Sequence, residues 1–271
     1  MHFAKKKSLG QHFLNSDYVP ERMCTAGDIR PGDTVLEIGP GTGALTKVLL
    51  AHGATVIALE TDPRALEVLR ETFAAALDTG QLTLIKADAR ALDPAKYGLG
   101  PHTYKVVANV PYYLSGQLLR RVLDTTHQPT TLVFLLQKEL VERIARAKKS
   151  SLLSISVAVF GTPHYVTTVK RTHFSPPPKV DSAILLVDEI TDTRLPPGER
   201  AAFFNLLQHG FGQKRKQLQG NLNALYPRPV LQAAFATLGL TDTIRAEDLS
   251  VADWLQLHFH LQSTASSPAS P

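Results

Sequence analysis

The chain has 271 residues, 44% of them hydrophobic, and a formal net charge of +5 at pH 7. This length supports one large core, or one core with a smaller domain. It contains no apolar run long enough for a membrane span and no apolar segment typical of a signal peptide, so we expect no membrane association. Cys24 is its single cysteine, so we expect no intramolecular disulfide, no metal site and a cytoplasmic location.

The first part of the chain predicts an arm, a helix and a strand–turn–helix unit. Residues 1–16 are basic and predict a flexible arm, and 17–26 fit a short helix. A β-branched, apolar strand over 34–38 then passes through the glycine-rich turn 39–43 into a helix over 44–51. Glycines in such a turn let a ligand lie against bare main chain. The spacing Gly-x-Gly-x-Gly does not match the dinucleotide fingerprint, so the turn alone does not identify the ligand.

Strands and helices alternate along the middle of the chain. Further buried strands are predicted over 55–59, 82–86, 105–108 and 130–136, with helices over 63–77, 115–123 and 138–147. Residues 151–160 fit a strand or a helix, and the alternation favours a helix. Two closing strands, 165–169 and 182–187, have no helix between them and predict a hairpin at the sheet edge. The pattern predicts an α/β fold with a doubly wound, mostly parallel sheet.

The last part of the chain has a different character. A polar, proline-containing linker covers 191–198, and helical periodicity follows, with breaks at Gly210–Gly212, Pro227–Pro229 and Gly239. We therefore expect an α/β domain over 17–190, a small helical domain over 191–262 and a disordered Ser/Pro/Ala-rich tail over 263–271.

Basic residues gather in three tracts that contain no carboxylate. They precede Asp17, separate Glu142 from Asp181, and separate Glu199 from Asp242. Such tracts indicate a polyanion partner, although ordinary solvated surface is the alternative. The candidate phosphate contacts are Lys5, Lys6, Lys7, Arg143, Arg146, Lys148, Lys149, Lys179, Lys214, Arg215 and Lys216.

Polar groups follow four of the predicted strands in succession. They are the Gly39–Gly43 turn, Glu60, Asp88 and Asn109, and ligands of open α/β sheets bind beyond the carboxyl ends of the strands. Glu60 could accept the hydroxyls of a ribose and Asp88 an exocyclic N–H of adenine, although each acid could also be a helix cap or a surface group. Together they indicate a nucleoside site. With Glu37 they bring three acids to this edge, which favours cationic S-adenosylmethionine over a nicotinamide dinucleotide.

The tetrapeptide from Asn109 to Tyr112 indicates chemistry on an exocyclic amine. The Asn109 side-chain oxygen and a neighbouring backbone carbonyl could each accept one hydrogen of such an amine, which frees its lone pair and stabilises developing charge. Pro111 stiffens the turn and Tyr112 could stack on a base. The alternative is a strand-end turn with an Asx cap.

Several motifs together resemble the ribosomal RNA adenine N6-dimethyltransferases, most nearly their bacterial small-subunit (16S) branch. The resemblance runs from about Lys5 to Trp254 and rests on Lys7–Asn15, Val35–Gly41, Leu59–Asp62, Ala87–Asp88, Asn109–Tyr113, Phe174–Val180 and the basic stretch Gly210–Leu218, which resembles a helix of the family. It implies a Rossmann-like, S-adenosylmethionine-dependent methyltransferase fold with a small C-terminal all-helical domain. It also implies a monomeric enzyme that dimethylates two adjacent adenines in a hairpin near the 3′ end of small-subunit rRNA, within an assembling 30S particle.

The resemblance also assigns roles to residues. It implies cofactor contacts at His12, Leu14, Gly39, Gly41, Glu60, Asp88 and Asn109, and catalytic roles for Asn109, Pro111, Tyr112 and Phe174. His12 departs from the family, which usually has Asn there, and the charge of a histidine near a sulfonium depends on pH. Phe174 would close over the target adenine opposite Tyr112, and the alternative for it is a core aromatic.

Three other functions stay open. A DNA adenine N6-methyltransferase would share the amine-binding turn, and a macrolide-resistance methyltransferase would act on large-subunit rRNA. A binding protein of this fold would have lost catalysis, against which the presence of Glu60, Asp88, Asn109 and Tyr112 argues. The basic stretch Gln213–Lys216 favours the small-subunit enzyme.

Overall fold

The structure, a computed structural model, describes residues 12–266, so the candidate RNA contacts Lys5, Lys6 and Lys7 lie outside it. Contacts divide the chain into two compact units. We call Met1–Arg146 with Gly161–Ile190 the sheet unit, and Ala147–Phe160 with Thr191–Pro271 the helical unit. Within the described residues, no helix has the length and apolar character needed to cross a membrane.

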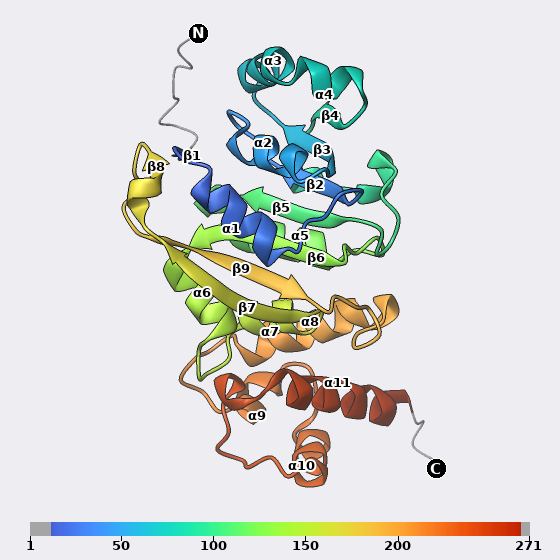
Figure 1. Cartoon of the computed structure of the whole chain (residues 1–271). Helices are drawn as coiled ribbons and strands as arrows, with labels where there is room; N and C mark the ends of the chain where they lie inside the picture. Colours follow the sequence, from blue (N-terminus) through green and yellow to red (C-terminus); the bar gives the residue numbers. More distant parts are fainter. Residues whose placement is uncertain (1–11, 267–271) are drawn as a thin grey trace. The chain divides into compact units, whose positions relative to one another are not determined.

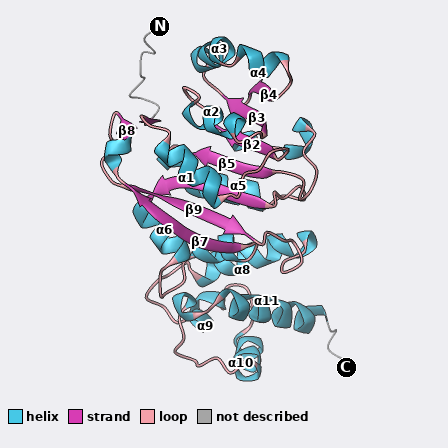
Figure 2. Cartoon of the chain, in the orientation of Figure 1, coloured by secondary structure: helices cyan, strands magenta, loops and turns pink. Residues whose placement is uncertain are grey.

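A seven-stranded sheet is the centre of the sheet unit (Figures 1 and 2), with the order β4-β3-β2-β5-β6-β9-β7. The strands are β2 (Thr34–Ile38), β3 (Thr55–Glu60), β4 (Leu82–Lys86), β5 (Lys105–Asn109), β6 (Thr131–Gln137), β7 (Thr162–Val169) and β9 (Ser182–Asp188). The neighbouring strands β4, β3, β2, β5 and β6 run parallel to one another. β9 pairs antiparallel with β6, and β7 pairs antiparallel with β9 at the edge of the sheet. The doubly wound, mostly parallel sheet and its edge hairpin are confirmed. The strand order reverses between β2 and β5, which is where such sheets bind ligands.

Helices of the sheet unit are α1 (Tyr18–Ala26), α2 (Ala44–Ala51), α3 (Pro63–Thr72), α4 (Ala74–Asp78), α5 (Ser115–Leu123) and α6 (Lys138–Ala145). One helix was expected over 63–77, but it breaks at Phe73, whose φ is −115°. A Cβ on Gly43 would lie 2.4 Å from the Phe73 ring, so this ring occupies the space that the glycine leaves open. The break therefore accompanies tight packing of the ring on the glycine turn.

The N-terminal segment is partly ordered into a short strand. β1 (Phe13–Leu14) pairs antiparallel with β8 (Phe174–Ser175). The Asn15 side chain also donates a hydrogen bond of 2.9 Å to the carbonyl of Thr172. The expected flexible arm over 1–16 is therefore wrong for residues 13–14, because pairing with a segment distant in sequence fixes them.

The helical unit contains α7 (Leu152–Ala158), α8 (Arg200–Gly210), α9 (Leu218–Leu222), α10 (Arg228–Thr237) and α11 (Val251–Ser266). The preference for a helix within 151–160 is confirmed. This segment groups with the helical unit, whereas the sequence placed it in the first domain. Phe160 lies 6.0 Å from Phe204 between ring centroids, and the Ser150 amide donates to the Glu247 carbonyl at 2.8 Å. Both contacts join this segment to residues distant in sequence, so its local pattern could not show that it belongs to the helical unit.

Two expectations for the C-terminal part are wrong. The stretch Gly210–Leu218 is not a helix: α8 ends at Gly210, α9 begins at Leu218, and turns lie between them. Gly210 packs tightly, since a Cβ there would lie 2.4 Å from the Trp254 ring. The tail was expected to be disordered over 263–271, but α11 continues to Ser266, and the residues beyond it lie outside the described range.

Acid is expected to destabilise the helical unit through His258. This side chain is fully buried, and burial lowers the pKa of its imidazole, against the opposing effect of Glu199 at 2.8 Å. The unfolded chain therefore binds a proton that the folded chain does not, so stability falls as pH drops below ~6.5, by at most ~1.4 kcal/mol per pH unit. Denaturant unfolding at several pH values checks this. His258→Gln should flatten the profile, and His260→Gln on the same helix is the control; equal profiles for wild type and His258→Gln contradict the prediction.

Candidate functional site

A cavity of about 300 Å³ lies in the sheet unit, lined by residues that follow β2, β3, β4 and β5. Every residue to which the sequence assigned a catalytic or cofactor role lines it. These are His12, Leu14, Gly39, Gly41, Glu60, Asp88, Asn109, Pro111, Tyr112 and Phe174. The fold therefore brings together segments from three distant parts of the chain.

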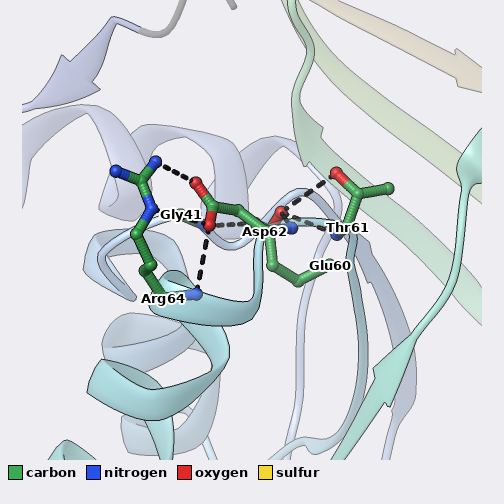
Figure 3. Close-up of polar contacts among 5 residues, drawn as sticks. All are labelled: Gly41, Glu60, Thr61, Asp62 and Arg64. Atoms are coloured by element: carbon green, nitrogen blue, oxygen red, sulfur yellow. Dashed lines mark hydrogen bonds and ion pairs between the residues drawn. The ribbon is translucent and has the colours of Figure 1, made fainter. Parts of the chain in front are cut away.

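The glycine turn after β2 is tied to the end of β3 through Glu60 (Figure 3). The carboxylate is 5% exposed, and its Oε2 accepts a hydrogen bond from the Gly41 amide at 3.2 Å. Its Oε1 accepts from the amides of Thr61 at 2.7 Å and Asp62 at 2.9 Å. Gly39 has φ +70°, and apart from its chain neighbours no heavy atom of the described residues lies within 4 Å of where a Cβ would be, so bare main chain is exposed there.

These bonds limit what Glu60 can hold. A carboxylate has about four lone-pair positions. On Glu60, Oε1 accepts from two backbone amides and, at 3.4 Å, from the Thr61 hydroxyl, while Oε2 accepts from the Gly41 amide. About one position, on Oε2, is left for a ligand hydroxyl. Accepting both hydroxyls of a ribose, as the sequence suggested, requires the 3.2 Å bond from the Gly41 amide to give way.

Glu37 is not the third charged acid that the sequence suggested. It is 1% exposed, its Oε2 accepts a hydrogen bond of 2.7 Å from the Thr46 hydroxyl, and its Oε1 has no hydrogen-bond partner within residues 12–266. Burial raises the pKa of this carboxyl to about 8, so it is mainly protonated at neutral pH. The negative charge at the cavity therefore comes from other acids.

Asp88 is one such acid. Its Oδ2 accepts a hydrogen bond of 2.6 Å from Nη2 of Arg90, and its Oδ1 accepts from the Arg90 amide at 2.9 Å. The side-chain bond from Arg90 lowers the pKa of Asp88, which keeps this carboxylate ionised. Arg90 thus orients the Asp88 carboxylate, which presents a fixed acceptor at the cavity.

Asn109 is oriented by the N-terminal segment. Its Nδ2 donates a hydrogen bond of 3.2 Å to the His12 carbonyl, which leaves Oδ1 as the acceptor for a ligand. The Pro111 carbonyl accepts the Leu114 amide at 3.0 Å. Among the hydrogen bonds of the described residues, none engages the neighbouring Val110 carbonyl. The turn therefore offers two acceptors, one from a side chain and one from the backbone.

Aromatic residues flank these acceptors. The Tyr112 hydroxyl is hydrogen-bonded to the Ser182 hydroxyl at 2.8 Å, and its ring centroid lies 5.8 Å from that of His12. Nδ1 of His12 lies 2.8 Å from the Pro176 carbonyl, which connects the N-terminal segment to the loop after β8. Phe174 is 3% exposed, belongs to the hydrophobic core and lines the cavity. The interpretation of Phe174 as a core aromatic is confirmed, and its closing over a target adenine stays a prediction.

Sequence reasoning missed four residues that shape the site. Phe13 lies over the glycine turn, 3.0 Å from where a Cβ of Gly41 would be, while Thr46, Arg90 and Ser182 hold site residues in place. Arg90 could have been found from its position two residues after Asp88. Ser182 gives no local signal, because a long stretch of chain separates it from its partner Tyr112.

The candidate RNA contacts fall into two groups. Arg143 pairs with Glu139 at 3.4 Å, Arg146 lies 3.8 Å from the Tyr165 ring centroid, and Lys149 pairs with Glu247 and Asp248. Their charges are partly engaged within the fold. The others are exposed, and within residues 12–266 no ion pair is found for them: Lys148, Lys179, Lys214, Arg215 and Lys216.

Comparison with known proteins adds the family. Residues 2–263 match the model of a family described as ribosomal RNA adenine dimethylase. The chain belongs to this family. Among its relatives are the ribosomal RNA small subunit methyltransferases A of Dehalococcoides mccartyi strain CBDB1, 37% identical over 93% of this chain and 87% of the relative, and of Thermosynechococcus vestitus, 38% identical over 93% and 95%.

Solved structures of rRNA adenine dimethylases and related enzymes have the same fold. A dimethyladenosine transferase from Plasmodium falciparum matches with a TM-score of 0.79 and 26% identity over 94% of this chain and 98% of the other. The 23S rRNA methyltransferase ErmE matches with a TM-score of 0.73 and 25% identity over 92% and 99%. As a member of this family, the protein is an rRNA adenine dimethyltransferase that uses S-adenosylmethionine.

The residues at the cavity fit this cofactor. Gly39 offers bare main chain, Asp88 is an ionised acceptor, and Glu60 has a lone-pair position left for a hydroxyl. When bound, S-adenosylmethionine supplies an electrophilic methyl group on a sulfonium. The Glu60 and Asp88 side chains at the cavity suit this cation and would repel a pyrophosphate.

Proposed function

We propose that this enzyme dimethylates N6 of two adjacent adenines in a hairpin near the 3′ end of small-subunit rRNA. The observation that carries the proposal is the 37–38% identity to small-subunit methyltransferases over 93% of the chain. The likeness to the 23S rRNA methyltransferase ErmE is lower, at 25% identity, and supports the large-subunit alternative less.

The turn after β5 is proposed to bind and activate the target amine. Adenine N6 is a poor nucleophile because its lone pair is delocalised into the ring. Oδ1 of Asn109 and the Val110 carbonyl would each accept one N6 hydrogen, which favours a pyramidal nitrogen and stabilises the positive charge that develops on it. The bond from Asn109 to the His12 carbonyl supports this role, because it fixes which end of the amide faces the substrate.

The remaining residues at the cavity are proposed to position the two substrates. Tyr112, held by Ser182, would stack on the target base, with Pro111 stiffening the turn and Phe174 closing the other side. Glu60 and Asp88 would hold the ribose and the adenine amine of the cofactor, with His12, Leu14, Gly39 and Gly41 completing its site. Catalysis then consists of positioning and electrostatic stabilisation.

The decisive experiment is methylation of small ribosomal subunits that lack the modification. Incubation with S-adenosylmethionine should place two methyl groups on each of two adjacent adenines, mapped by primer extension and mass spectrometry. Large subunits and duplex DNA are the parallel substrates. Methylation of large subunits with none on small subunits would overturn the proposal, and methylation of DNA alone would support the DNA-enzyme alternative.

The cellular setting is part of the proposal. We infer that the substrate is rRNA within an assembling 30S particle, and that the enzyme acts as a cytoplasmic monomer. Comparing naked rRNA with assembly intermediates as substrates tests the first inference. Sedimentation of the free enzyme tests the second, and a dimer at working concentration would contradict it.

Lys214, Arg215 and Lys216 are expected to contact RNA phosphates. All three are exposed in the turns between α8 and α9, and the described residues provide no ion pair for them. Replacing all three by Ala should reduce the slope of log affinity against log salt by up to about 2–3, since each phosphate contact contributes ~0.7–0.9. Lys149→Ala is the matched control, because Glu247 and Asp248 already pair with that ammonium. An unchanged slope in the triple variant would show that these residues are only solvated surface.

A further inference from the structure

The most exposed of the large hydrophobic side chains in the described structure lies at the cavity. Tyr113 is 67% exposed, although it directly follows the half-buried Tyr112 and lines the same cavity. A side chain that is both solvent-exposed and cavity-lining lies at the opening. Singly exposed apolar side chains are common on protein surfaces, so it is the position of this ring at the cavity, and not its exposure alone, that points to a ligand.

The ring of Tyr113 is held on a fixed backbone. It belongs to the single turn Tyr112–Leu114, which leads into α5, and the Ser115 hydroxyl donates a hydrogen bond of 3.0 Å to the Tyr112 carbonyl. The preceding Tyr112 is anchored by Ser182 at 2.8 Å. Tyr113 therefore presents its ring at a defined place without a hydrogen-bonding partner among the described residues.

A cation lines the same cavity as this ring. Arg90 lines the cavity, its Nε and Nη2 donate to Asp88, and no bond from Nη1 is found among the described residues. The hydrogen bond with Asp88 fixes this guanidinium, and Arg90 and Tyr113 line the same cavity. An exposed aromatic ring and a guanidinium with a free edge at one cavity suit a single-stranded nucleotide, since the ring can stack on the base and the cation can attract the phosphate.

We propose that Tyr113 is a stacking platform for the nucleotide next to the target adenine. This inference rests on the proposed function, in which the target is one of two adjacent adenines. When one base turns into the cavity, its neighbour in the chain stays at the opening, where Tyr113 lies. The platform would hold the second adenine while the first is methylated, so it is a positioning residue for RNA and makes no contact with the methyl donor.

The test compares Tyr113→Ala, Tyr113→Phe and Tyr18→Ala. Tyr18 is the matched control, since it is 57% exposed but does not line the cavity. On small subunits that lack the modification, Tyr113→Ala should lower kcat/KM about 10- to 100-fold, mainly through KM, as expected for loss of one stacked base. Tyr113→Phe should stay within about threefold of wild type, because the ring does the stacking. Calorimetric affinity for S-adenosylmethionine should be unchanged in all variants.

A second arm identifies the base that the ring contacts. Small subunits are reconstituted with rRNA that carries an abasic nucleotide beside the target adenine, and a double-mutant cycle is measured with Tyr113→Ala. Loss of the ring and loss of the base should not add, because each removes the same contact. Additive losses, or a Tyr113→Ala variant with the KM of wild type, would overturn the proposal. The wild-type enzyme is measured on the same small subunits, and its methylation of them tests the proposed function separately. Failure of the Tyr113 proposal would therefore leave the proposed function intact.

Discussion

Replacing Asn109 by Ala is expected to lower kcat about 100- to 1,000-fold while KM for RNA changes little, the usual cost of one preorganised acceptor. The reason is that Oδ1 is the side-chain acceptor left at the cavity once Nδ2 is bound to the His12 carbonyl. Its bond to the amine strengthens as the nitrogen becomes pyramidal and gains charge. The effect therefore lies in the transition state, and single-turnover rates on small subunits measure it.

Asn109→Asp separates the acceptor from the tie to the N-terminal segment. Aspartate keeps an acceptor for the amine but has no N–H for the His12 carbonyl, 3.2 Å away in the wild type. It should therefore retain more activity than Ala and less than the wild type. Asn205→Ala, at an exposed position of α8, controls for loss of an asparagine. If Asn109→Ala and Asn109→Asp both methylate at near-wild-type rates, the amine-binding role of this turn is wrong.

Glu60→Ala is expected to weaken S-adenosylmethionine binding about 10- to 100-fold, since a hydrogen bond to a charged group contributes ~1.5–3 kcal/mol. The substitution should also affect stability, because the amides of Gly41, Thr61 and Asp62 would lose their acceptor. We therefore expect a loss of about 1–3 kcal/mol in stability as well.

The comparison with Glu60→Gln separates the two effects. Glutamine keeps one acceptor oxygen, which can serve Thr61 and Asp62, but places an amide group against the Gly41 N–H or against the ligand. It should recover much of the stability and little of the affinity, measured by denaturant unfolding and calorimetry. Glu67→Ala, an exposed acid of α3, is the control. Wild-type affinity in both Glu60 variants would remove this residue from the cofactor site.

Local sequence signals predicted most of the sheet unit, because each of its strands and helices has a recognisable pattern within a short stretch of sequence. β2 and β3 appear as apolar runs, since a parallel strand is buried on both faces, and α3 begins with a local signal, because the Asp62 side chain accepts a hydrogen bond from the Arg64 amide. The gathering of these residues at the cavity could be predicted for the same reason. Glu60, Asp88 and Asn109 each follow a strand, and parallel strands place their carboxyl ends at one edge.

What the sequence by itself determined is therefore the fold class and which side chains gather at the cavity. Only the tertiary structure decided how those side chains are held and charged. Glu37 is neutral because the fold removes it from water, Asn109 faces the cavity with its oxygen because His12 takes its nitrogen, and Tyr112 is anchored by Ser182. Solvation and pairing between distant segments depend on all neighbours in space at once. Patterns within one stretch of sequence do not contain that information. For the same reason, the sequence pattern placed 147–160 in the first domain, whereas in the structure this segment belongs to the helical unit.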